Sequence, residues 1–219
     1  MHARPTATVV LLALAVHAGC VSLKRTSEAR FFALRPVAEG PEAPAVESGA
    51  GIVGVLPVWL PAHLERPQLV AWTAPGEVRI DEFLRWTEPL DAAVQRVLVE
   101  DLDTLLPSYR IVRAPWPAAT PLRCRVRVEL FRFGPQPGAE VSLSGRFVLL
   151  PEGGERALAI RAVDLRRDAA SRPEDPGRSV EAMSALLAEL SGRIAGAIAA
   201  LPADPTERAS AREASPSPR

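Results

Sequence analysis

Cysteine and histidine are the side chains most often used for nucleophilic catalysis and metal binding, and this sequence holds few of them. Its 219 residues include two cysteines and three histidines. The position with the clearest chemistry is Cys20, which follows Ala18 and Gly19 at the end of a short apolar run. Small residues directly before a cysteine are what a lipoprotein signal peptidase accepts, so this spacing predicts acylation of Cys20.

The residues before Cys20 are typical of a secretory signal. Their apolar run, residues 9–16, is far shorter than the roughly 20 residues that span a bilayer. We therefore expect a lipoprotein signal peptide over residues 1–19 and a lipidated tether over residues 20–30. The alternatives are a plain signal peptide cleaved near Ala18, or an uncleaved buried segment. No aspartate follows Cys20, which favours an outer-membrane anchor facing the periplasm over retention in the inner membrane.

The other candidates for chemistry do not form a site. His2 and His17 lie in the predicted signal peptide, and His63 has only Glu65 nearby, which is too few ligands for a metal. Cys124 lies in an alternating segment and is expected to be a small buried hydrophobe, with an intermolecular disulfide as the alternative. The common nucleophile, zinc and phosphate-binding motifs are absent from the sequence. The sequence thus predicts no catalytic residue, no metal site and no cofactor.

The charge balance argues against a nucleic-acid partner. Lys plus Arg and Asp plus Glu number 26 each, so no global field attracts a polyanion. Arg123, Arg125 and Arg127 alternate along a predicted strand and are expected to form a solvated face, while aromatic residues make up only 5% of the chain. We therefore expect no binding of nucleic acid.

Hydrophobic periodicity predicts one domain over residues 31–201, followed by a disordered tail over residues 202–219. Two helices are expected, at residues 88–106 with Thr87 as the N-cap and at residues 179–201. Strands are expected at residues 31–34, 51–60 with an interruption at Pro57, 68–73, 77–82, 109–112, 122–133 with a bulge near Phe131, 140–150 and 156–165.

These elements sum to an α+β fold. The last three strands are consecutive and predict an antiparallel meander. The economical packing is a mostly antiparallel mixed sheet covered on one face by the two amphipathic helices. Trp59 and Trp72 are expected in the core rather than at the surface.

Several segments resemble a known family. The first is Ile52–Val70 (IVGVLPVWLPAHLERPQLV), and the second is Arg85–Leu90 (RWTEPL) at about the expected distance downstream. Pro115-Trp116 and the opening Phe31-Phe32-Ala33-Leu34 fit as well. Together they resemble the ABC-type transport auxiliary lipoproteins of the PqiC type, over roughly residues 30–201. His17 departs from the aliphatic residue that the lipoprotein signal normally has at this position.

The resemblance implies a non-catalytic outer-membrane lipoprotein of an ABC/MCE-type lipid transport system that spans the periplasm. Such a subunit would dock the MCE-domain protein, work with the associated ABC permease and ATPase, and support envelope integrity. It is expected to form a homo-oligomer and to be attached to the membrane by its lipid anchor.

Partner contacts are expected at Leu60, His63, Leu64, Arg66 and Trp86. The prolines around Leu60 and Leu64 should stiffen an exposed loop and so lower the ordering cost of docking. Trp86 can instead be a core aromatic at the start of the helix. Two other functions are kept open: a periplasmic lipid-binding carrier lipoprotein, and an envelope hydrolase with a cleft of converging polar groups.

Overall fold

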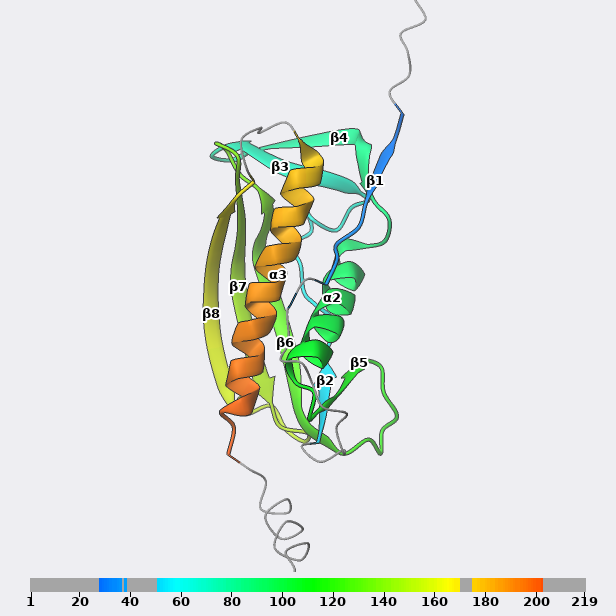
Figure 1. Cartoon of the computed structure of the whole chain (residues 1–219), viewed down its shortest axis with the longest axis vertical. Helices are drawn as coiled ribbons and strands as arrows, with labels where there is room; N and C mark the ends of the chain where they lie inside the picture. Colours follow the sequence, from blue (N-terminus) through cyan, green and yellow to red (C-terminus); the bar gives the residue numbers. More distant parts are fainter. Residues whose placement is uncertain (1–27, 37, 39–50, 170–174, 203–219) are drawn as a thin grey trace, which may run out of the picture.

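A computed structural model describes residues 28–36, 38, 51–169 and 175–202. These residues form eight strands and two helices, distributed over a sheet of three strands and a sheet of five (Figure 1). The predicted signal peptide, acylated Cys20, most of the tether and almost all of the predicted tail lie outside the described residues. The α+β class predicted from the sequence is confirmed.

The larger sheet has the order β5-β2-β6-β7-β8. The strands β6 (Leu122–Pro135), β7 (Glu140–Leu150) and β8 (Ala159–Asp168) form the predicted antiparallel meander. β2 (Ile52–Val55) runs parallel both to β6 and to β5 (Arg110–Arg113). Alternation along β6 sets the two faces, because its apolar residues Cys124, Val126, Val128 and Leu130 are buried while the arginines between them are partly exposed.

The remaining strands form a second, smaller sheet rather than part of the first. β3 (Gln68–Ala74) and β4 (Glu77–Trp86) make an antiparallel hairpin, and β1 (Arg30–Phe32) adds to β4 in parallel. The sequence predicts one sheet, and this prediction is wrong. Both edges of β6 are already paired, with β2 and β7, so the hairpin cannot join the meander there. It crosses one end of the molecule instead (Figure 1).

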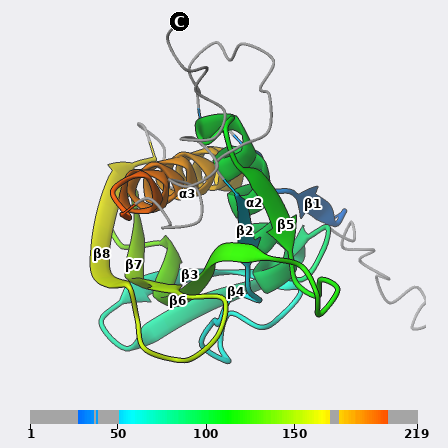
Figure 2. The same ribbon diagram turned by 90° about the horizontal axis from the view of Figure 1, so that it is seen from below.

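The two helices, α2 (Leu90–Leu105) and α3 (Pro176–Ala199), pack side by side on one face of the larger sheet (Figure 2). Leu98, Leu102 and Leu187 are fully buried between helices and sheet. The α3 helix is long and apolar enough to cross a membrane, but 56% of its most apolar window is buried inside the domain. Its burial against α2 and the sheet is that of a core helix.

The two helices are capped differently at their N-termini, and the cap of α2 differs from the one predicted. Asp175 caps α3, accepting a hydrogen bond from the Gly177 N–H at 2.9 Å. The residue that caps α2 is Pro89, which provides no side-chain acceptor, so the predicted Thr87 cap is wrong. Thr87 instead donates its backbone N–H to the carbonyl of Phe32, since β1 lies alongside the end of β4.

The predicted bulge in β6 is confirmed. The register with β7 shifts between Leu130 and Arg132, which turns Phe131 outward and Phe133 into the core. Gly145 on β7 faces this point, where a Cβ would lie 2.2 Å from the carbonyl oxygen of Glu129. Glycine is therefore required for the two backbones to approach so closely.

The segment 51–60 is shorter as a strand than predicted. β2 ends at Val55, and Trp59 returns to the sheet only as an isolated bridge to Glu129, because Pro57 has no N–H to donate. Trp59 was expected in the core, yet 52% of its surface is exposed. On the outer face of β2, the Trp116 ring lies over Gly54, where a Cβ would approach it to 2.8 Å.

Candidate functional site

The proline-rich segment after Trp59 does not present the leucines expected at its surface. Leu60 and Leu64 are 1% and 3% exposed. A turn closed by the Leu64 N–H and the Pro61 carbonyl, at 2.8 Å, folds both side chains into the core. The expectation that this loop exposes Leu60 and Leu64 is wrong. The loop is anchored to the domain because these two side chains pack into the core.

His63 and Arg66 remain closer to the surface. The His63 imidazole is half-buried and packs edge-on against the Trp72 ring, with centroids 5.7 Å apart. Arg66 is also half-buried, and its Nε has no hydrogen-bond partner among the described residues.

An open hollow joins the two segments that resemble the family. It has a volume of about 630 Å³ and is lined by Glu65–Pro67 and by Trp86–Asp91. The Trp86 N–H donates to the Pro67 carbonyl at 2.8 Å, which ties the end of β4 to the loop. We call this feature the motif hollow. It brings together Arg66 and Trp86, two of the five predicted contact residues.

Trp86 itself is mostly structural. It is 7% exposed and belongs to the core, which agrees with the alternative of a core aromatic at the helix start. Trp86 still lines the motif hollow, together with Leu90 of α2. The hollow therefore has a rigid apolar floor.

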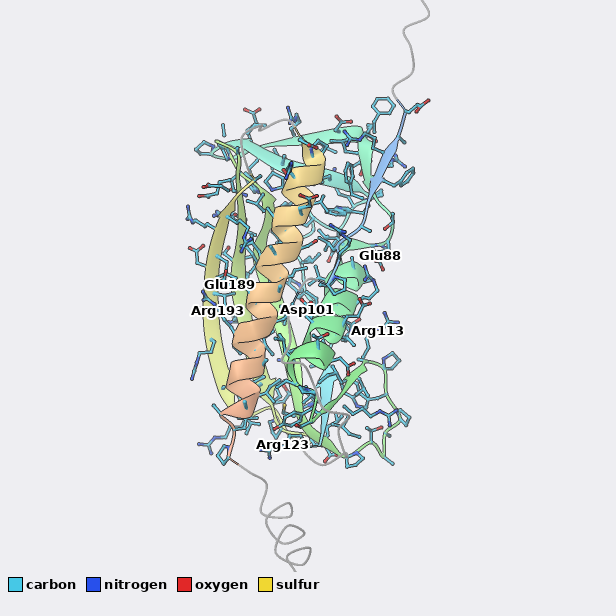
Figure 3. The ribbon with its side chains drawn as sticks, in the orientation of Figure 1. Glu88, Asp101, Arg113, Arg123, Glu189 and Arg193 are labelled. Carbon is cyan, nitrogen blue, oxygen red and sulfur yellow. The ribbon has the colours of Figure 1, made fainter. Side chains whose placement is uncertain are left out.

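The rim of the motif hollow is charged. Glu65 and Asp91 are exposed, while Glu88 accepts a hydrogen bond from Arg96 at 2.7 Å. Figure 3 shows Glu88 at the start of α2, on the side of the helix away from α3. The lining holds no histidine, cysteine or serine, and no group of three metal-ligating side chains occurs among the described residues.

A second open hollow of about 610 Å³ lies on the outer face of the larger sheet. Trp59 and Phe131, 52% and 50% exposed, meet there edge to face at 6.4 Å. Arg146 lies 6.0 Å from the Phe131 ring and pairs with Glu129 at 2.6 Å. Sequence reasoning missed this aromatic pair, although the break of alternation at Phe131 was its available signal.

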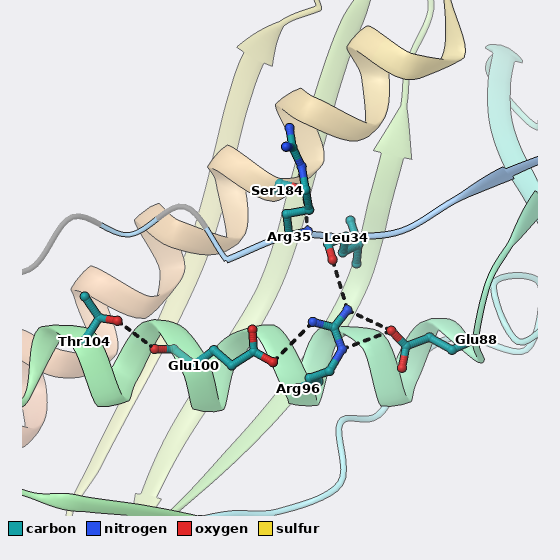
Figure 4. Close-up of polar contacts among 7 residues, drawn as sticks. All are labelled: Leu34, Arg35, Glu88, Arg96, Glu100, Thr104 and Ser184. Atoms are coloured by element: carbon teal, nitrogen blue, oxygen red, sulfur yellow. Dashed lines mark hydrogen bonds and ion pairs between the residues drawn. The ribbon is translucent and has the colours of Figure 1, made fainter.

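The chain that leads from the tether into the domain is held by both helices. The guanidinium of Arg96 on α2 donates to the Leu34 carbonyl at 3.0 Å, and Arg35 donates its N–H to the Ser184 hydroxyl on α3 at 3.2 Å (Figure 4). Leu34 is buried in the core. We call residues 34–36 and 38 the strap. Hydrogen bonds to Glu88, and then to Glu100, raise the pKa of Arg96, so the bridging residue stays charged.

Asp101 fastens the far end of the strap. This carboxylate is 1% exposed and lies between α2 and α3 (Figure 3). It accepts hydrogen bonds from the Ala38 N–H and from the Ser191 hydroxyl, each at 3.1 Å. A buried carboxylate is stable only when it is hydrogen-bonded, so Asp101 links the strap and both helices into one unit.

Cys124 is a free, fully buried thiol on the inner face of β6, as the sequence predicts. Burial raises its pKa to about 11, which keeps it protonated and unreactive at neutral pH. It therefore lacks the properties of a nucleophile.

Solved structures share this fold. A crystal structure of an uncharacterized protein superposes with a TM-score of 0.65 and 19% identity, covering 78% of this chain and 99% of that chain. A Xanthomonas campestris protein of family DUF330 gives a TM-score of 0.62 and 16% identity, covering 76% of this chain and 93% of that chain. A comparison with curated proteins finds no match.

The family model for the ABC-type transport auxiliary lipoprotein component matches residues 32–195, which span the strap, both hollows, α2 and most of α3. That match covers well over half of the chain. The fold and both sequence segments of the motif hollow lie within it. This protein therefore belongs to the ABC-type transport auxiliary lipoprotein components.

Proposed function

We propose that this chain is a non-catalytic outer-membrane lipoprotein, facing the periplasm, which docks the MCE component of an ABC-type lipid transport system and supports envelope integrity. The family match and the predicted acylation of Cys20 support this role. The observation that carries the docking function is the motif hollow, where Glu65–Pro67 and Trp86–Asp91 converge. Homo-oligomerisation and association with a permease and ATPase complete the proposal.

The hollow has the anatomy of a docking site. Trp86 and Leu90 give it an apolar floor, and the exposed Glu65 and Asp91 give it a polar rim. The half-buried Arg66 lines the hollow, and its guanidinium can donate to a partner's carboxylate or carbonyl. The prolines and the buried Leu60 and Leu64 fix the loop beforehand, so little conformational entropy is lost on binding. His63 braces the loop against Trp72.

The packing favours docking over the alternative of a lipid carrier. A carrier would need room for an acyl chain between helices and sheet. That space is filled by large side chains such as Leu98, Leu130 and Leu187, each 0% exposed. Both hollows described above are open to the surface instead.

The test is recovery of an MCE-domain protein from crosslinked envelopes with this lipoprotein as bait. We expect Arg66→Glu to lower that recovery by about tenfold, because it replaces the donor with a charge that repels an acceptor. The matched control is Arg193→Glu, which reverses an exposed arginine that pairs with Glu189 on α3. It should leave recovery unchanged.

Circular dichroism of both variants checks that the fold is retained. If the wild-type bait recovers no MCE-domain protein, the proposed function is wrong. If both variants reduce recovery equally, the motif hollow is not the docking site.

A further inference from the structure

The small sheet exposes two phenylalanines on the face that is turned away from the core. Phe31 of β1 is 62% exposed and Phe83 of β4 is 40% exposed. Each of them directly precedes a residue that packs against the core, Phe32 after Phe31 and Leu84 after Phe83. Neighbouring side chains on a strand point to opposite faces, so both exposed phenylalanines point away from the core.

The opposite face of the same strands is already packed. Phe32 and Leu84 pack against the core, and Trp86 belongs to it. A sheet with one face on the core ordinarily has polar residues on its solvated face. Here two aromatic side chains occupy that face, and the described residues leave much of each ring exposed. Two exposed aromatic side chains on one small sheet are available for contact with another apolar surface.

The position of the tether limits what that surface is. β1 begins at Arg30, ten residues after Cys20, and extended chain spans at most about 3.6 Å per residue. The small sheet therefore lies within about 36 Å of an acylated Cys20. It is also the end of the molecule where the chain enters, whereas α3 finishes at the opposite end (Figure 1).

The charges around the two phenylalanines are balanced. Strands β1 and β4 carry Arg30, Arg79 and Arg85 against Glu77, Asp81 and Glu82. Arg85 lies 3.5 Å from Glu82, so part of the charge is neutralised within the face. Attraction to a lipid surface would then come from the aromatic rings and not from anionic headgroups.

We propose that the outer face of the small sheet, through Phe31 and Phe83, rests in the interfacial region of the bilayer that holds acylated Cys20. This inference depends on the lipid anchor of the proposed function. Contact at this sheet fixes the orientation of the domain, and the motif hollow then opens beside the membrane, because β4 ends at Trp86 on its floor.

The test uses an environment-sensitive fluorophore on a single introduced cysteine in the full lipoprotein. Cys124 is 0% exposed and Cys20 is consumed by acylation, so Phe83→Cys supplies the reactive thiol. Phe131→Cys is the matched control, since Phe131 is 50% exposed on the outer face of the other sheet. The proteins are reconstituted into phosphatidylcholine vesicles containing a spin-labelled lipid, with and without phosphatidylglycerol.

We expect the lipid spin label to quench the fluorophore at residue 83 at least about twofold more than at residue 131, equally in both lipid mixtures. Equal quenching at the two residues, or quenching at residue 83 only with phosphatidylglycerol, overturns the proposal. Flotation is measured on the same samples. A protein that fails to float has no anchor, which overturns this inference and the proposed function together, whereas flotation without quenching at residue 83 removes the inference alone.

Discussion

At the scale of single residues, Cys124 shows how burial turns a reactive group into a structural one. Its pKa rises from 9.0 to about 11 because the thiolate would be desolvated between strand and helices. The folded pKa lies above the unfolded one, so the stabilisation from the neutral thiol is complete below about pH 9 and is lost as pH rises toward 11.

We therefore expect wild type to lose about 2 kcal/mol of unfolding free energy relative to Cys124→Ala between pH 7.5 and about pH 10.5. Urea denaturation of both proteins at the two pH values measures this difference. Comparing wild type with the variant at each pH cancels the contributions of other groups that titrate in the same range. A gap between wild type and variant that does not change with pH would show that the thiol ionises as readily in the folded state as in the unfolded one.

At the scale of elements, the strap depends on Arg96, which joins α2 to the chain arriving from the tether. Arg96→Ala removes the donor to the Leu34 carbonyl and leaves Glu88 without its cation. Because Arg96 is partly exposed, we expect a loss of only about 1–2 kcal/mol of unfolding free energy. We also expect faster hydrogen exchange at the Arg35 amide, since the strap is less tightly held.

The matched control for this prediction is Arg193→Ala on α3. Arg193 makes an exposed pair with Glu189 four residues earlier, at 2.8 Å. Exposed pairs of this kind contribute about 0.5 kcal/mol or less, and no exchange change is expected in the strap. Equal effects from the two arginines would mean that the bridge from α2 to the strap adds no more stability than a surface pair.

At the scale of the whole molecule, attachment to the membrane is expected to depend on the lipid alone. Cys20→Ala removes the acyl chains, each methylene of which contributes about 0.8 kcal/mol, and should release the domain into the soluble fraction. Cys124→Ala is the matched cysteine change and should leave the protein with the membranes. Fractionation followed by immunoblotting separates the two outcomes. Retention of the Cys20→Ala protein would point to a second membrane element, for which the exposed Phe31 and Phe83 of the small sheet are the candidates.

The sequence alone determined the features that depend on short-range periodicity. The alternation in residues 122–130 decides which side chains of β6 can face the core, and the break at Phe131 already shows the bulge. The spacing of apolar residues in α3 puts them on one side of the helix, which is the side that must pack against the rest of the domain. The motif segments suffice to indicate the family, because their residue types and order are visible without a fold.

Tertiary structure decided what depends on residues distant in the chain. Exposure of Trp59 and burial of Leu60 and Leu64 follow from how the loop folds onto the core, and neighbours in sequence do not reveal it. The split into two sheets follows from which strands pair, since β4 pairs with β3 and β1 and neither edge of the five-stranded sheet takes the hairpin. In the motif hollow the Trp86 N–H meets the carbonyl of Pro67, and at Asp101 the helix α3 brings Ser191 to a residue 90 positions away. Such contacts are set by the packing of whole elements, and no local pattern encodes them.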